Sequence, residues 1–164
     1  MGVVYMKTRK TIYIVLLIAW ATVIFLFSNQ NAKESESVSD GVASKIIDTI
    51  QEVTNHKINK EDKSRLINNT RFIIRKVAHF TLYFGLGTLA YLVSVKFSIK
   101  KPTISAVLFC FLYACGDEVH QLFLDGRTAK ILDVCIDTCG SSLAVICLFY
   151  LQKFKKSTMI SKIS

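Results

Sequence analysis

Residues 11–27 read TIYIVLLIAWATVIFLF, an apolar run without a charged side chain. A helix crosses the hydrocarbon core of a bilayer with roughly 17–25 predominantly apolar residues, so this run is long enough to span it. Lys7, Arg9 and Lys10 come directly before the run. A basic start and an apolar run also describe a signal peptide, but the polar segment 28–31 is a poor cleavage site. We therefore expect an uncleaved membrane anchor.

Three further apolar runs are long enough to span a bilayer, at about residues 72–95, 102–124 and 131–151. The chain of 164 residues is 51% hydrophobic and has a single proline, a composition that suits long uninterrupted helices. A membrane β-barrel would show alternating segments of about ten residues, which are absent from the sequence. The sequence therefore predicts an all-α polytopic membrane protein with about four transmembrane helices, in one domain over residues 1–164.

The segment 28–71, between the first two apolar runs, is polar and mixed in charge. Within it, apolar residues recur at helical spacing among charged ones: Val42, Ile46, Ile47, Ile50 and Val53. We interpret residues 40–55 as an amphipathic helix that lies on the outer surface or caps the bundle. A solvated linker with little helix is the alternative.

The net charge of +9 does not indicate a nucleic-acid partner, because the basic residues flank apolar runs as membrane anchors do. Residues 1–10, 96–101 and 152–164 together hold ten basic residues and no acid. Cytoplasmic loops are enriched in Lys and Arg, so we expect both termini in the cytoplasm and the segment 28–71 outside. The expected location is the cell membrane, with membrane lipids as neighbours.

All five cysteines fall in the predicted spans and form no CxxC pair: Cys110, Cys115, Cys135, Cys139 and Cys147. An odd number without paired spacing is not a disulfide framework, and we expect buried thiols that act as small apolar residues. The sequence also has no Gly-rich phosphate loop and no GxSxG nucleophile motif.

Ionisable residues in three of the predicted helices lie at one depth. At about 1.5 Å per residue, His79 lies about 10 Å inside its helix and Asp137 about 9 Å inside its own. Asp117 lies seven residues from the end of the third span. Charged groups at such depth persist where they face a bundle interior or a wet cavity and can pair.

Each of these residues has a polar residue four positions away, and so on the same helix face: Arg75 with His79, Gln121 with Asp117, and Asp133 with Asp137. We therefore predict a polar pocket that opens to the outside. A structural ion-pair network that fixes helix packing is the alternative. A metal site from His79, His120 and the acids is chemically possible, but the spacing is not diagnostic, so we predict neither metal nor cofactor.

Two motifs give the chain a family resemblance. Residues 75–80, RKVAHF, with Tyr83 and Gly85-Leu86-Gly87, resemble the first motif of the VanZ-like family. Residues 117–123, DEVHQLF, followed by Arg127 and Asp133, resemble its second, and Gly140 suits the glycine that follows. Asp137 departs from the family pattern, which has asparagine more often. The resemblance covers about residues 11–151.

The resemblance implies a role in the cell envelope, since the family's namesake raises resistance to the glycopeptide antibiotic teicoplanin. We consider three hypotheses: a lipid-headgroup site that binds or modifies an anionic lipid-linked cell-wall precursor, a non-catalytic binding or shielding protein, and a small proton-coupled transporter. Whether the protein is an enzyme stays open. The catalytic candidates are His79, Asp117 and Glu118. The ligand-binding candidates are Arg75, Lys76, Tyr83, His120, Gln121, Arg127, Asp133 and Asp137.

Overall fold

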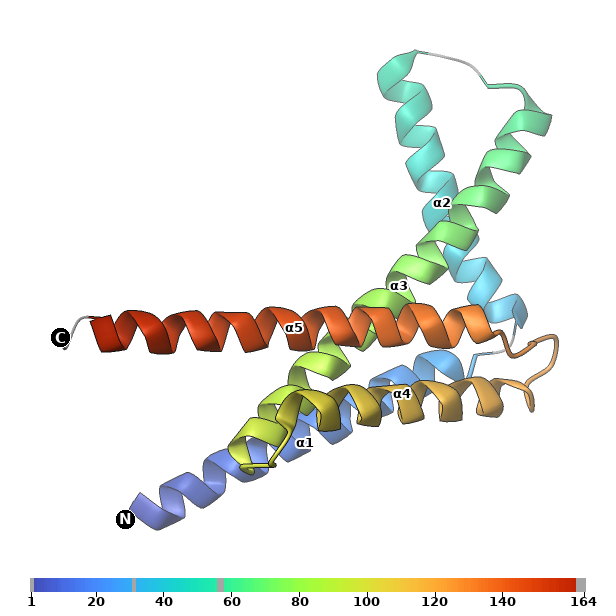
Figure 1. Ribbon diagram of the computed structural model, residues 1–164. Coiled ribbons are helices and arrows are strands. Elements are labelled where there is room, and N and C mark those ends of the chain that lie inside the picture. The colour runs from blue at the N-terminus through green and yellow to red at the C-terminus, as the bar shows by residue number, and fades with distance from the viewer. Residues whose placement is uncertain (1, 31, 56–57, 162–164) are drawn as a thin grey trace.

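A computed structural model describes residues 2–30, 32–55 and 58–161, and this described part consists of helices and their connections, without strands. Residues 1, 31, 56–57 and 162–164, which belong to segments considered above, lie outside the described part. The five helices follow in chain order: α1 (Gly2–Ser28), α2 (Ala32–Thr54), α3 (Lys60–Lys96), α4 (Pro102–Gln121) and α5 (Ile131–Ser161) (Figure 1). The all-α prediction is confirmed.

Four of these helices, α1, α3, α4 and α5, are long and apolar enough to cross a membrane, as predicted. Many of their large apolar side chains are exposed, as in Ile18 and Leu112, which suits helices that face lipid. The multi-pass membrane architecture is thereby supported.

α3 and α5 extend beyond their predicted spans, because a helix can continue past the membrane, where its side chains need not be apolar. α3 begins at Lys60, not at 72, and its start is capped by the side chain of Asn59, which accepts a hydrogen bond of 2.8 Å from the Asp62 N–H. α5 runs past 151 to Ser161 through a basic stretch, whereas α4 ends at Gln121 rather than at 124.

The amphipathic helix exists, and α2 begins at Ala32, eight residues before its predicted start at 40. Its Ala43 and Ile47 are buried. Ion pairs tie it to α3: Lys63 to Asp48, and Arg71 to Glu36 and Asp40. In Figure 1, α2 and the first part of α3 form a hairpin that projects from the other helices. A solvated linker is therefore excluded for this segment.

α3 is the central helix, since it contacts each of the other four. α1 is joined to it by a hydrogen bond of 2.9 Å from the Trp20 indole N–H to the Leu82 carbonyl. The buried core consists of small and apolar side chains from α1, α3, α4 and α5: Ile24, Tyr83, Leu86, Ala90, Tyr91, Ala106, Cys110, Ala114 and Val145. Of the five cysteines only Cys110 is buried, while Cys135, Cys139 and Cys147 are exposed on α5, so the expectation of buried thiols is wrong for these three. These three thiols are free and lie on the exposed side of α5, which lipid could contact.

α3 and α5 approach each other through two glycines. A Cβ atom on Gly140 of α5 would lie 2.4 Å from the Phe80 carbonyl oxygen, and one on Gly87 of α3 would lie 2.5 Å from that of Ser141. Both distances are shorter than any van der Waals contact, so only glycine fits. Small residues at such crossings let two membrane helices pack backbone against backbone.

Candidate functional site

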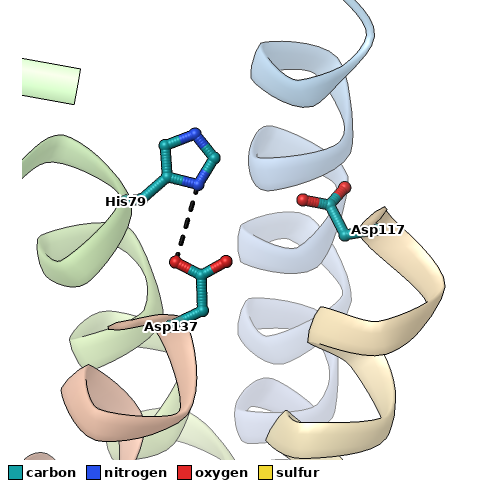
Figure 2. A group of neighbouring side chains, drawn as sticks. All are labelled: His79, Asp117 and Asp137. Atoms are coloured by element: carbon teal, nitrogen blue, oxygen red, sulfur yellow. Dashed lines mark ion pairs between the residues drawn. The ribbon is translucent and has the colours of Figure 1, made fainter. Parts of the chain in front are cut away.

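Three ionisable side chains from three helices meet at one point: His79 of α3, Asp117 of α4 and Asp137 of α5 (Figure 2). Each offers one ligand-type atom, and these atoms all lie within 4.8 Å of one another. His79 Nδ1 lies 3.5 Å from Asp137 Oδ1, without a hydrogen bond between them. Asp137 is 0% exposed and Asp117 is 6% exposed. The three residues that the sequence places at one depth therefore also lie close together in space.

The glycine crossing explains this convergence. Phe80, whose carbonyl meets Gly140, directly follows His79 in the sequence. Asp137 precedes Gly140 by three residues, and positions three apart lie on the same helix face. The contact that brings the two backbones together thus also brings His79 to Asp137.

Asp117 is held from α1 by a residue that the sequence analysis did not consider. Ser28, the last residue of α1, is 2% exposed, and its Oγ donates a hydrogen bond of 2.6 Å to Asp117 Oδ2. Gln121 donates from Nε2 to the same oxygen at 3.5 Å. A serine directly after a long apolar run is the signal that would have drawn attention to this position.

A cavity of about 150 Å³ lies beside this cluster, and three of its lining side chains are basic or imidazole groups: Arg75, His79 and Arg127. The rest of its wall is apolar or weakly polar and comes from α1, α2, α3 and residue 30: Phe27, Gln30, Ser35, Val38, Ser39, Val42, Ile74, Ala78 and Leu82. α2, for which no part in the pocket is predicted, supplies one of its walls.

The two arginines of this cavity pair with no carboxylate in the described part of the chain. Arg127 donates from Nη1 to Gln121 Oε1 at 3.2 Å, while its Nε is buried without a hydrogen-bond partner among the described residues. Burial lowers the pKa of Arg127, and the nearby Arg75 guanidinium lowers it further. A guanidinium nevertheless keeps its charge in proteins, so the cavity is positively charged at this end.

Two of the predicted ligand-binding residues, Lys76 and Asp133, contact each other. Lys76 donates to Asp133 across the α3–α5 contact, and its ammonium lies 5.2 Å from the centre of the Phe72 ring. Neither residue lines the cavity. This pair corresponds to the structural alternative, in which charges fix helix packing.

Glu118, His120 and Tyr83 also lie outside the cavity lining. Glu118 Oε2 accepts a hydrogen bond of 2.7 Å from the Lys130 N–H, which anchors the loop before α5. The His120 ring packs on Phe25 with 4.9 Å between centroids. Tyr83 is 0% exposed, and its hydroxyl has no hydrogen-bond partner among the described residues. The predicted roles of these residues stay predictions.

The arrangement can bind an anion through its two guanidiniums, and its carboxylates and imidazole are of the types that hold a divalent cation. Among known proteins, the model of the VanZ/LLP1 family matches residues 13–152. No curated protein matches the chain, and no solved structure does. Because the match includes α3, α4 and α5 in their membrane-spanning parts, it contains every residue of the cluster and of the arginine pair. The chain belongs to the VanZ/LLP1 family.

Proposed function

We propose that the cavity binds the phosphate-bearing headgroup of an anionic lipid, and that the ligand is a lipid-linked cell-envelope precursor. The observation that carries this proposal is the pair of guanidiniums, Arg75 and Arg127, which line the cavity without a carboxylate partner among the described residues. Partly buried cations that form no direct ion pair are costly, and an anionic ligand in contact with them offsets that cost.

The chemistry of the cavity fits an amphiphile better than a free anion. Planar guanidinium groups bind phosphate oxygens in pairs, which supplies geometry as well as charge. Other lining residues are apolar, with Val38 and Val42 from α2 and Ile74 and Leu82 from α3. Such a wall accommodates the first carbons of a lipid chain while the arginines hold its headgroup. Four helices are long and apolar enough to cross a membrane, and in a bilayer they would bring the cavity next to lipid.

His79 decides between the binding and the catalytic form of this function. It lines the cavity and also lies against Asp137, so it is placed to give or take a proton at the headgroup. In a catalytic protein, His79→Ala retains lipid binding and abolishes turnover. In a binding or shielding protein, affinity and phenotype fall together. Either form would contribute to glycopeptide resistance by changing the amount or accessibility of the precursor at the outer face.

Native mass spectrometry of the protein released from nanodiscs tests the proposal. We expect Arg75→Ala and Arg127→Ala each to lower retention of a polyprenyl pyrophosphate by about tenfold or more, since hydrogen bonds between charged groups contribute about 1.5–3 kcal/mol. Arg65→Ala is the matched control: Arg65 lies on the same helix, its side chain is 74% exposed, and it is absent from the cavity lining. Equal retention in all three variants would contradict the proposal.

Three lipids added to the same nanodiscs identify the ligand class: the polyprenyl pyrophosphate, phosphatidylglycerol and phosphatidylethanolamine. Arginine-dependent retention of the pyrophosphate above phosphatidylglycerol supports a lipid-linked precursor. Equal retention of the two anionic lipids reduces the proposal to a general anionic-lipid site. Retention of phosphatidylethanolamine at the same level would show that charge has no role and would exclude the proposed function.

A further inference from the structure

The cluster of His79, Asp117 and Asp137 contains more unsatisfied polar atoms than a structural ion-pair network would leave. Both carboxylate oxygens of Asp137 and Nδ1 of His79 are buried without a hydrogen-bond partner in the described chain. The buried hydroxyl of Tyr83, one helical turn along α3 from His79, is also without one. Buried polar groups are nearly always satisfied, so an unpaired set around one point indicates that something binds between them.

From this geometry we infer that His79, Asp117 and Asp137 bind a divalent metal cation. The atoms they offer lie within 4.8 Å of one another. The His79 Nδ1 to Asp137 Oδ1 distance of 3.5 Å is long for a hydrogen bond. It matches the separation of two ligands that share one ion, which is about 3.4 Å for a tetrahedron with bonds near 2.1 Å. Figure 2 shows the Asp117 carboxylate on the opposite side of this space from His79.

The charge of the cluster favours a bound divalent cation over a single bound proton. Two buried carboxylates within reach of each other repel, and a protonated His79 would supply one positive charge against two negative ones. A divalent ion neutralises both carboxylates and leaves the imidazole neutral, as a metal ligand must be. The arginines cannot take this role, because neither Arg75 nor Arg127 pairs with Asp117 or Asp137.

Neighbouring side chains orient one of the three metal-binding residues, Asp117, as is usual in metal sites. Ser28 and Gln121 both donate to Oδ2 of Asp117, so the carboxylate has a fixed orientation. Hydrogen bonds of this kind to a metal-ligating carboxylate commonly raise metal affinity. The three ligands come from three helices and are 38 and 20 residues apart in sequence, which is why their spacing was not diagnostic.

The donor set, one imidazole nitrogen and two carboxylate oxygens, favours Zn²⁺, Mn²⁺ or Fe²⁺ over Ca²⁺, which prefers oxygen ligands alone. With three protein ligands, an ion keeps a further position for water or a ligand oxygen. His79 lies both in the cluster and in the cavity wall, so that position is next to the cavity. The cation site stands whether or not the cavity binds a lipid, since none of its ligands is an arginine.

Metal content of the purified protein tests the inference. After treatment with EDTA and reloading in separate samples with Zn²⁺, Mn²⁺ or Ca²⁺, inductively coupled plasma mass spectrometry should find about one tightly held Zn²⁺ or Mn²⁺ per chain and no Ca²⁺. His79→Ala, Asp117→Asn and Asp137→Asn should each weaken binding by more than about tenfold. Asp125→Asn is the matched control, because Asp125 is an exposed acid in the loop after α4 and lies outside the cluster.

A second measurement, thermal unfolding, distinguishes variants that lose the metal from variants that fail to fold. Addition of the metal should raise the thermal unfolding temperature of the wild type and of Asp125→Asn, but not that of Asp137→Asn. Wild-type protein that binds neither Zn²⁺ nor Mn²⁺ would overturn the inference, as would cluster variants that retain the ion. Arg75→Ala and Arg127→Ala should still bind the metal. If these two variants lose the lipid but retain the metal, the cation site and the lipid site are independent. A failure of one proposal can then be distinguished from a failure of the other.

Discussion

Gly140 of α5 lies against the backbone carbonyl of Phe80 on α3, so close that a Cβ atom would come within 2.4 Å of the oxygen. This contact sets the distance between the two helices at the level of the site. His79 and Asp137 lie next to it in sequence and space, and their approach to 3.5 Å depends on it. A glycine in a membrane span thus has a direct structural role in the candidate site.

Gly140→Ala should therefore destabilise the protein by about 1–3 kcal/mol, the usual result of inserting a methyl group into a packed contact. The Phe80 carbonyl belongs to a helix backbone and cannot move aside as a flexible side chain would. The measurement is unfolding in detergent micelles, followed by circular dichroism. Gly116→Ala is the control, since a Cβ there meets nothing within 4 Å. It should leave stability unchanged or raise it slightly, because alanine is the better helix former. Equal effects of the two substitutions would refute the role of the crossing.

Ser28→Ala should lower stability by about 1.5–3 kcal/mol, the range for hydrogen bonds to charged groups, because it leaves buried Asp117 without its shortest hydrogen bond. Thr22→Ala, also in α1, removes a hydroxyl that bonds only to the carbonyl of Ile18 in its own helix and is exposed. That control should change stability by less than about 0.5 kcal/mol. Both are measured by thermal unfolding in the same detergent, and indistinguishable midpoints would show that Ser28 is dispensable.

Lys76 and Asp133 should show a coupling energy of about 0.5–3 kcal/mol in a double-mutant cycle of Lys76→Met and Asp133→Asn, as is usual for residues in direct contact. Their side chains are only 21% and 17% exposed, so water screens the pair weakly. The comparison pair is Arg65 with Glu61, 74% and 79% exposed, for which about 0.5 kcal/mol or less is expected. If the coupling of Lys76 with Asp133 is near zero, the pair does not fix the α3–α5 contact.

Labelling of single cysteines in a cysteine-free background should establish the orientation. Lys60→Cys and Thr128→Cys should react with a membrane-impermeant maleimide added to intact cells, because the positive-inside rule places both positions outside. Lys100→Cys, in the basic loop between α3 and α4, should react only after the cells are opened. All three positions are exposed, so burial does not confound the comparison. External labelling at position 100 would reverse the topology and place the arginine cavity on the cytoplasmic side.

Arg75→Lys should accumulate normally in the membrane and yet fail to support teicoplanin resistance, because a lysine keeps the charge but cannot bind a phosphate in the paired geometry of a guanidinium. Resistance is measured as the inhibitory concentration in a sensitive host at matched protein levels. Arg65→Lys, on the exposed part of the same helix, should keep full resistance. Normal resistance in both variants would leave Arg75 a structural residue.

Local properties of the sequence were sufficient to predict the spanning helices and the level at which ionisable groups lie. Apolar length decides whether a helix can cross a bilayer, and the rise per residue converts position in a span into depth. Both follow from a continuous stretch of chain without reference to its neighbours. Amphipathic spacing is likewise a local pattern and predicts the α2 helix, although α2 begins eight residues before the predicted start.

Only the tertiary structure decided which charged groups face one another. Successive residues of a helix point about 100° apart, so Asp117 and Glu118 share a depth but face different partners: Ser28 of α1 in one case, the Lys130 backbone in the other. Helix rotation and crossing depend on contacts between distant segments, such as Gly140 against Phe80 and α2 against α3. No local pattern encodes these contacts. The cluster therefore forms only when the helices pack and bring together His79, Asp117 and Asp137. The same is true of the cavity wall that α2 supplies.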